Sequence, residues 1–283
     1  MGTFVSDFES NYETVAVEQR DDGATWITFN RPEKRNAMNP RMHFEMVDVL
    51  GRLEADDRTR VLVFTGAGES WVAGQDIEEY FRQQDDDPMG LAASSRASQE
   101  WRWRRLWAYP KPTIAMVNGW CFGGGFTQLT ACDLAIAADE AQFGLSEVNW
   151  GILPGGYVSR AIKEVLGYRD IMRLILTGDP IDGKEAERIG LVNKSVPLAE
   201  LRDETERLVA KLLLKNSAVM NATKQAYKFV KDMGMLEAEE YLKVKQIALR
   251  ATDPQKGRTH GMSQFLDDKT YRPGLGPYQQ PVQ

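Results

Sequence analysis

The sequence contains few residues that bind transition metals or act as nucleophile partners. Among 283 residues there are two histidines, His43 and His260, and two cysteines, Cys121 and Cys132. A zinc site built from several imidazoles is therefore excluded, and a Ser-His-Asp triad would have to use one of the two histidines. The cysteines lack CxxC spacing and lie in apolar segments, which indicates reduced thiols. We expect a protein without a metal site.

The sequence also lacks the features of nucleic-acid and membrane proteins. Lys and Arg total 35 against 41 Asp and Glu, so the net charge is −6, and this argues against binding to nucleic acid or an anionic membrane. The first nine residues have no basic segment followed by an apolar one, as a secretory signal would. The longest apolar region, 113–138, is interrupted by Asn118 and Asp133. We expect a cytoplasmic protein with no nucleic-acid or membrane partner.

Apolar patterning predicts an α/β chain up to about residue 196. Met46, Leu50 and Leu53 form one stripe of a helix over 40–54, with Pro40 at its start. The acidic residues, Pro, Gly and Ser of 83–98 predict a mobile surface segment. Alternation and short apolar runs predict strands at 14–18, 24–29, 60–65, 113–117 and 133–138, the first two forming a hairpin.

The chain after residue 196 has a helical pattern with charged faces. Helices are predicted over 197–215, 217–232 and 235–250. We therefore expect an α/β core over 1–196 and a helical C-terminal region over 197–283. The charged faces of that region are interpreted either as solvated surface or as contacts with neighbouring subunits.

Two glycine-containing loops are the most informative local feature. Three consecutive glycines, 123–125, precede a predicted helix, so their backbone N–H groups are free to meet a ligand. A second such loop, 71–77, also follows a strand. Two opposed N–H donors beside one carboxylate are what thioester enolate chemistry requires. A tight strand–helix junction is the alternative explanation of the glycines.

Six segments, which overlap both loops, carry a family resemblance. They are FNRPEKRNAM at 29–38, AGQDI at 73–77, KPTIAMVNG at 111–119, GGGF at 123–126, ACDLAIA at 131–137 and FGLSEVNWG at 143–151. Taken together, they resemble the crotonase, or enoyl-CoA hydratase/isomerase, superfamily along nearly the whole chain. The resemblance implies a crotonase-like spiral of ββα units with a helical C-terminal region that forms a homotrimer or a dimer of trimers. It also implies an acyl-CoA thioester substrate and no cofactor, because CoA is part of the substrate.

The resemblance assigns roles to individual positions. The backbone N–H groups of Gln75 and Gly124 would hold the thioester carbonyl oxygen. The side chain of Gln75 is a departure from the apolar residue common in the family, so substrate choice is open at this point. The positions expected to surround the CoA and the start of the acyl group are Lys34, Ala37, Ala73, Asp76 and Ile77.

The acidic residues point to one branch of the superfamily. Typical hydratases carry one Glu two residues after the glycine triplet and another in the FGxxE segment; here those positions are Thr127 and Glu147. This pattern, with the ending FLDDKTYRPGL at 265–275, is similar to the hydroxycinnamoyl-CoA (feruloyl-CoA) hydratase-lyases. Those enzymes hydrate a 4-hydroxycinnamoyl thioester and cleave it to an aromatic aldehyde and acetyl-CoA. Glu147 is then the single acid-base group, and a chemical role of Thr127 is left open.

Ring recognition is expected from a few aromatic and polar side chains. Tyr80 stands at the position of one phenol contact, although a helix-surface anchor is the alternative. Ser146 and Trp150 flank Glu147, and Trp150 is alternatively a core aromatic. Lys243 stands where the lyases carry a second tyrosine, so both its contact with substrate and the subunit it serves are open.

Two other functions are consistent with the motifs. One is an enoyl-CoA hydratase or isomerase acting on another acyl-CoA. The other is a non-catalytic member of the fold that binds acyl-CoA or RNA. The net charge of −6 disfavours RNA, and the presence of Gln75, Gly124 and Glu147 disfavours a protein without activity.

Overall fold

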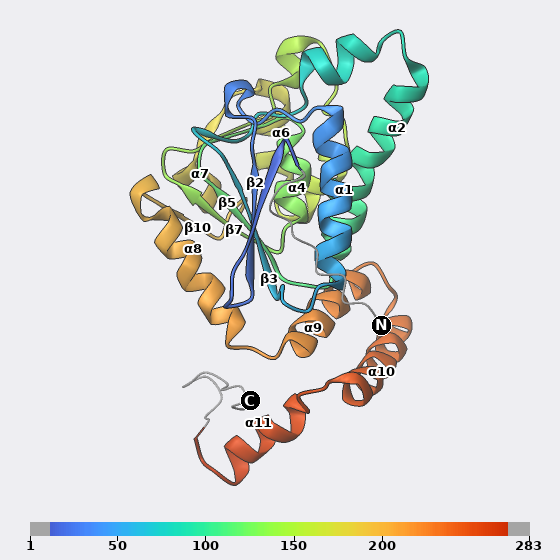
Figure 1. Ribbon diagram of the computed structural model, residues 1–283, viewed down its shortest axis with the longest axis vertical. Helices are drawn as coiled ribbons and strands as arrows, with labels where there is room; N and C mark the ends of the chain where they lie inside the picture. Colours follow the sequence, from blue (N-terminus) through green and yellow to red (C-terminus); the bar gives the residue numbers. More distant parts are fainter. Residues whose placement is uncertain (1–11, 271–283) are drawn as a thin grey trace.

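The computed structural model describes residues 12–270. The expectation drawn from the first nine residues, and the part of the C-terminal match that runs from 271 to 275, lie outside this range. Within it, two parallel-rich sheets form the centre of the molecule, and helices cover them (Figure 1). No helix in this range has both the length and the apolar character that a bilayer span needs.

The larger sheet has six strands in the order β1-β2-β3-β5-β7-β10. The first two form the predicted antiparallel hairpin, and all other pairs are parallel. Every residue of β3 and β5 is buried, as expected of parallel strands covered on both faces. The strands are β1 (Val15–Gln19), β2 (Ala24–Phe29), β3 (Val61–Gly66), β5 (Thr113–Val117), β7 (Leu134–Ala138) and β10 (Lys194–Val196).

The smaller sheet has the order β4-β6-β8-β9 and is parallel except for its last pair. Each of β3, β5 and β7 in the larger sheet is followed by a short strand in the smaller sheet and then by a helical turn. This repeat is the predicted spiral of ββα units. The short strands are β4 (Ser70–Val72), β6 (Trp120–Phe122), β8 (Gln142–Gly144) and β9 (Ile181–Asp182).

The helices surround this double sheet. The predicted helix over 40–54 is α1 (Pro40–Ala55), whose N-terminus is capped by the Asn39 side chain. The other helices of the core are α3 (Leu106–Ala108), α4 (Gly125–Ala131), α5 (Val158–Ala161), α6 (Tyr168–Thr177) and α7 (Gly183–Arg188).

The prediction of a mobile surface segment at 83–98 is wrong, because α2 (Pro88–Gln99) occupies most of it. Asp87 accepts a hydrogen bond from the Gly90 N–H, and Pro88 stands at the first helical position, so the residues that suggested a loop are a helix start. Ser94, Ala97 and Ser98 are buried. Such small side chains let α2 pack closely on α1 without an apolar stripe.

The three predicted C-terminal helices are present as α8 (Leu198–Leu213), α9 (Ser217–Val230) and α10 (Met235–Thr252), and a fourth, α11 (Gly257–Leu266), follows. Leu201, Thr205 and Val209 of α8 are buried, because α8 packs on the larger sheet. The chain then leaves the core, and α10 and α11 project from one end of the molecule (Figure 1).

Candidate active site

Two loops that follow β4 and β6 come together at the top of the sheets. The Met38 N–H donates to the Gly74 carbonyl at 2.8 Å, and the Asp76 N–H donates to the Met38 carbonyl at 2.9 Å. Gly74 has φ +97°, and a Cβ atom there would lie 3.2 Å from the Phe122 carbonyl oxygen and 3.7 Å from the Gly124 nitrogen. Glycine is therefore needed at residue 74, both for its backbone conformation and for the close approach of the two loops.

The backbone N–H groups of Gln75 and Gly124 are the notable donors at this junction. Within residues 12–270, neither of them donates a hydrogen bond to the protein. Both residues are half-buried, so these two N–H groups on adjoining loops are free to donate to an acceptor from a ligand.

Glu147 lies next to the glycine turn. It begins a short 3-10 turn (Glu147–Trp150) that two residues separate from the end of β8, and only 9% of its surface is exposed. Its Oε1 atom is 3.2 Å from the point where a Cβ atom at Gly123 would lie, and its Oε2 atom is buried without a hydrogen-bond partner. Burial raises the pKa of this carboxyl group. A carboxyl group in this state is suited to accept and return a proton.

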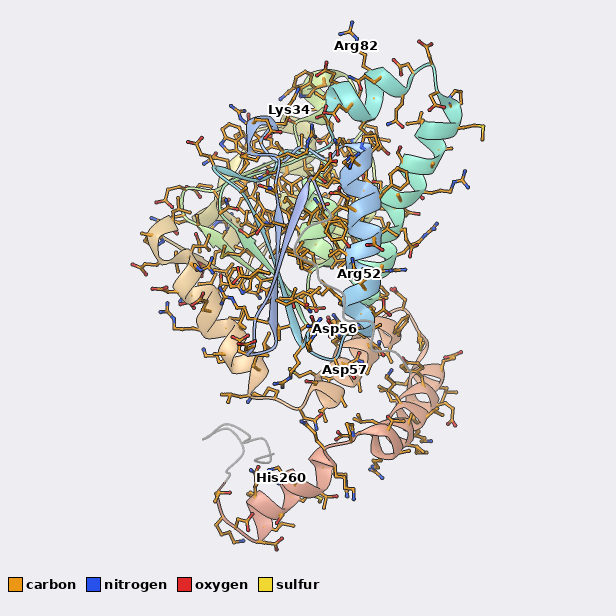
Figure 2. All side chains as sticks on the ribbon, viewed as in Figure 1. Lys34, Arg52, Asp56, Asp57, Arg82 and His260 are labelled. Carbon is orange, nitrogen blue, oxygen red and sulfur yellow. The ribbon has the colours of Figure 1, made fainter. Side chains whose placement is uncertain are left out.

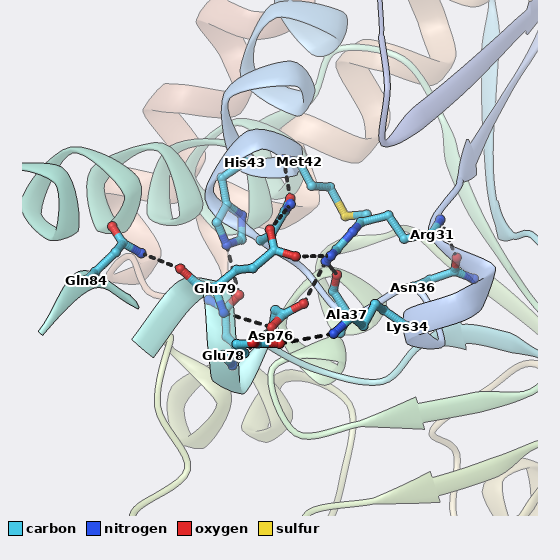
Figure 3. A network of polar contacts seen from close by, with 12 residues as sticks. Arg31, Lys34, Asn36, Ala37, Met42, His43, Asp76, Glu78, Glu79 and Gln84 are labelled. Atoms are coloured by element: carbon cyan, nitrogen blue, oxygen red, sulfur yellow. Dashed lines mark hydrogen bonds and ion pairs between the residues drawn. The ribbon is translucent and has the colours of Figure 1, made fainter. Parts of the chain in front are cut away.

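Arg31 fixes the loop that carries Gln75 (Figure 3). Its guanidinium donates to Asp76 Oδ2 at 2.9 Å, to the Ala37 carbonyl at 2.6 Å and to the Glu79 carboxylate. Burial alone would raise the pKa of Asp76, but hydrogen bonds from the Glu79 N–H and Arg31 lower it overall. Asp76 is therefore a structural anion that caps the turn Ile77–Phe81.

The residues predicted to surround CoA share one edge of the molecule. Lys34 is exposed there (Figure 2) and pairs with Glu78 at 3.2 Å. The Ala73 N–H donates to the Arg35 carbonyl at 3.1 Å, which joins the loop after β4 to the loop that holds Lys34 and Ala37. Ile77 is exposed beside them. Lys34, Ala37, Ala73 and Ile77 are called the rim below; they belong to the loop that carries Gln75 and to the segment hydrogen-bonded to it.

The predicted ring-contact residues have different environments. Tyr80 is 7% exposed and packs edge-on against His43 at a centroid distance of 5.3 Å, so it is not a surface anchor. Trp150 is 67% exposed and is not part of the core. Ser146 is half-buried and directly precedes Glu147.

Lys243 is not near these residues within one chain. It lies on α10, where it pairs with Glu239 and Glu240. That helix packs on α9, at the end of the molecule opposite Lys34 (Figures 1 and 2). His260, on α11, is at the same remote end (Figure 2).

Thr127 lies on α4 at the position of the second glutamate of typical hydratases. It is buried, and its hydroxyl donates to the Gly156 carbonyl at 2.6 Å. This hydrogen bond ties α4 to the loop before α5. Position 127 therefore carries no carboxyl group. Among the described residues, the acidic side chain beside Gly123 is Glu147.

A buried arginine was not among the residues that the sequence motifs indicated. Arg102 follows α2 in a π-helical turn (Glu100–Arg105) and is 2% exposed. Its guanidinium donates to Gln128 Oε1 at 3.1 Å, to Ser98 Oγ at 3.0 Å and to the Gly124 carbonyl. The residue that carries one unpaired N–H group is thus held by Arg102.

His43 was also missed as a site residue. The Trp101 indole donates to its Nδ1 atom at 2.9 Å, so the imidazole proton is assigned to Nε2, which donates to Gln75 Oε1 at 2.8 Å. Burial, and then the charge of Arg102, lowers the pKa of His43 to about 3. His43 lies three residues before Met46, on the buried face of α1, but no local pattern indicates Gln75 as its partner.

Comparison with known proteins agrees with this geometry. The family model described as enoyl-CoA hydratase/isomerase matches residues 19–272. The chain is 50% identical to the hydroxycinnamoyl-CoA hydratase-lyase of Pseudomonas fluorescens over 97% of this chain and 99% of that protein. It is 30% identical to the 2,3-dehydroadipyl-CoA hydratase of Escherichia coli, over 90% of this chain and 96% of that one.

Solved structures agree as well. A crystal structure of an enoyl-CoA hydratase subunit from Geobacillus kaustophilus superimposes with a TM-score of 0.81 at 29% identity, covering 94% of this chain and 99% of the other. Family model, relatives and fold therefore coincide over nearly the full length. The chain belongs to the enoyl-CoA hydratase/isomerase family, the crotonases.

Proposed function

We propose that this protein is a hydroxycinnamoyl-CoA hydratase-lyase, which converts 4-hydroxycinnamoyl-CoA or feruloyl-CoA and water into an aromatic aldehyde and acetyl-CoA. The observation that carries the proposal is the buried, unpartnered Glu147 carboxyl group beside a glycine turn with unpaired N–H donors. The 50% identity to a protein of that name selects the branch of the family.

The first step is the addition of water across the side-chain double bond. The Glu147 carboxylate accepts a proton from water as the oxygen attacks the β-carbon, and the electron pair of the double bond moves to the thioester as an enolate. The N–H groups of Gln75 and Gly124 stabilise the enolate oxygen. Glu147 then returns the proton to the α-carbon, which completes the β-hydroxy thioester.

The second step is a retro-aldol cleavage. Glu147 accepts the proton of the β-hydroxyl group, the bond between the α- and β-carbons breaks, and the aldehyde forms. The electron pair of that bond becomes the enolate of acetyl-CoA, held by the same two N–H groups. Protonation at the α-carbon by Glu147 gives acetyl-CoA. Both steps move only protons and electron pairs, so the proposed mechanism calls for no metal, redox group or other cofactor.

The aromatic ring would lie toward Tyr80. Its buried position beside the loop that carries Gln75 suits a hydrogen bond between its hydroxyl and the 4-hydroxyl group of the ring. Ser146 and Trp150 would line the pocket on the Glu147 side. The rim formed by Lys34, Ala37, Ala73 and Ile77 would hold the CoA.

We also propose that the protein acts in the cytoplasm as a homotrimer or a dimer of trimers. No residue of α10 is buried, and its Met235 and Leu236 side chains are 84% and 78% exposed. An apolar groove of about 710 Å³, lined by Leu212, Met220 and Leu249 among others, lies between the C-terminal helices and the core residues Pro112, Asp133 and Leu134. Exposed apolar surface of this kind is typical of subunit contacts.

The test is direct. Purified protein is incubated with feruloyl-CoA and, separately, with 4-coumaroyl-CoA, without added cofactor, and aldehyde and acetyl-CoA are measured. Equal amounts of vanillin or 4-hydroxybenzaldehyde and acetyl-CoA are expected. Folded protein that gives no aldehyde but hydrates crotonyl-CoA rapidly would instead be an enoyl-CoA hydratase.

A further inference from the structure

Arg102 is a buried cation with only neutral partners. Within residues 12–270 no carboxylate lies within ion-pair distance of it, and its three hydrogen bonds go to an amide, a hydroxyl and a backbone carbonyl. Burying a charge without a counter-charge opposes folding. Burial lowers the pKa of Arg102 to about 10, so the guanidinium is still protonated at neutral pH.

The Arg102 guanidinium lies in the space beside two glycines, Gly124 and Gly156. One terminal nitrogen, Nη2, is 3.1 Å from where a Cβ atom at Gly124 would lie. The other, Nη1, is 3.0 Å from the corresponding point at Gly156, which has φ +60°. The guanidinium therefore occupies space that side chains at these two positions would need. It lies directly against the residue whose N–H group is unpaired.

No carboxylate among the residues that the structure describes pairs with this charge. The elements packed around Arg102 contribute Ser98 from α2, Gln128 from α4, Tyr80 from the turn after β4 and the Gln75 amide. The remaining titratable neighbour, His43 on α1, is itself kept neutral in part by Arg102. The positive charge of Arg102 can therefore stabilise a negative charge that forms near the Gly124 N–H group.

We infer that Arg102 is a positioning residue of the oxyanion-binding site, which holds the Gly124 carbonyl group and places a fixed positive charge beside the forming enolate. The inference rests on the proposed function in that it takes the N–H groups of Gln75 and Gly124 as the enolate donors. In water-excluded sites, fixed charges and dipoles aimed at developing charge are the strongest contributors to rate. Arg102 therefore discriminates between the enolate and the neutral thioester.

This discrimination can be measured without catalytic turnover. Acetoacetyl-CoA has an acidic α-carbon, and its enolate absorbs in the near ultraviolet where the neutral form does not. Titration of the bound ligand gives the apparent pKa of enolisation in the site. Butyryl-CoA, which does not enolise in this range, reports the affinity for a neutral thioester.

Arg102→Gln is expected to raise the apparent pKa of bound acetoacetyl-CoA by about 1–2 units, the shift that a nearby opposite charge typically causes. At a pH where the wild-type site holds the enolate, binding weakens by about tenfold to a hundredfold. Butyryl-CoA binding changes by less than about threefold, a difference of roughly 0.6 kcal/mol. Arg102→Lys, which keeps the charge, retains most of the pKa shift.

Two results would overturn the inference: equal weakening of both ligands in Arg102→Gln, which indicates a structural role, or no change in either. Circular dichroism and thermal melting establish that the variants are folded. If Arg102→Gln does not fold, Arg102→Met removes the charge together with its cost of burial and gives the same readout. A negative aldehyde assay with an intact enolisation shift would remove the proposed lyase function but leave this inference in place.

Discussion

At the scale of single residues, the burial of Glu147 suits it to acid-base chemistry but destabilises the folded protein when the carboxyl group is charged. Its Oε2 atom is buried and makes no hydrogen bond within the described chain, so the charged form is poorly solvated in the folded protein. Because its folded-state pKa is raised, the native protein binds this proton more tightly than the unfolded chain does. The free energy of unfolding therefore falls as the pH rises through the raised pKa.

Glu147→Gln is expected to lower activity by at least about 100-fold, because a positioned acid-base group contributes that much. The same change is expected to raise the melting temperature at pH 7 by about 1–3 °C, since about 1 kcal/mol corresponds to 2–4 °C in a domain of this size. This gain disappears below about pH 4, where the glutamate is protonated in both states.

Thermal melts at pH 7 and pH 4 and steady-state rates check both parts. Glu18→Gln, which removes an exposed carboxylate paired with Arg20, is the matched control and should change neither quantity. A Glu147→Gln variant that is nearly as active as wild type would place the base elsewhere.

Tyr80→Phe tests ring recognition. Loss of one neutral hydrogen bond should reduce the preference for 4-hydroxycinnamoyl-CoA over cinnamoyl-CoA by about threefold to tenfold. The measurement is kcat/KM for hydration of the two thioesters. Tyr168→Phe, at an exposed position, should leave the ratio unchanged. An unchanged ratio in Tyr80→Phe would move phenol recognition to another residue.

At the scale of elements, Arg31 joins two segments that are 45 residues apart in sequence: the 3-10 turn Pro32–Lys34 with its flanks and the loop after β4. Its ion pair with Asp76 is almost fully buried, whereas the pair of Lys34 with Glu78 is exposed. The two pairs connect the same segments in different surroundings. They should therefore differ strongly in their contribution to stability.

Arg31→Met is expected to reduce the free energy of unfolding by about 3 kcal/mol, because it leaves the Asp76 carboxylate buried without its partner. Weaker acyl-CoA binding should accompany this loss, since the loop carrying Gln75 loses its anchor. Urea unfolding and ligand titration measure the two effects. Lys34→Met should leave stability unchanged, and Arg31→Met with Asp76→Asn should recover part of the loss. Equal effects of the two single variants would contradict this account.

The elements that could be predicted from sequence are those whose signal is local. The buried strands over 60–65 and 113–117 and the helix over 40–54 follow from apolar runs and period, and the structure confirms them. The helix α2 has small buried residues instead of an apolar stripe. Without such a stripe, the start signal Asp87-Pro88 does not distinguish this helix from a loop.

The site was predictable to the extent that backbone motifs define it. Glycine-containing loops and Glu147 are visible in the sequence, because their roles depend on residue type and spacing. Arg102 is different, since its partners Gly124 and Gln128 are 22 and 26 residues away and meet it only when α4 packs on the turn after α2. The same holds for His43 and Gln75, which are 32 residues apart.

At the scale of the whole molecule, Lys34 of the proposed CoA rim and the helices α10 and α11 lie at opposite ends (Figures 1 and 2). Lys243 therefore contacts a substrate only if α10 of one subunit reaches the active site of another. Whether Lys243 contacts the substrate therefore depends on how the subunits assemble.

We expect Lys243→Ala to lower kcat/KM for feruloyl-CoA by about tenfold, the effect of losing a hydrogen bond from a charged group. Co-assembly of Lys243→Ala subunits with inactive Glu147→Gln subunits should restore part of the activity, because some sites then combine a wild-type Glu147 with a wild-type Lys243. Light scattering establishes the oligomeric state of the mixture. Lys211→Ala, at an exposed position on α8, is the control. A mixture no more active than its parts would exclude a contribution from a neighbouring subunit.

The burial of both thiols has a practical consequence. Cys121 and Cys132 are enclosed in the core, and burial raises the pKa of each thiol far above its ordinary value. Neither is a reactive thiolate in the folded state. A single cysteine introduced on α10 can therefore carry a fluorophore or spin label without removal of the native cysteines, and the surroundings of that helix become directly observable in the otherwise unaltered enzyme.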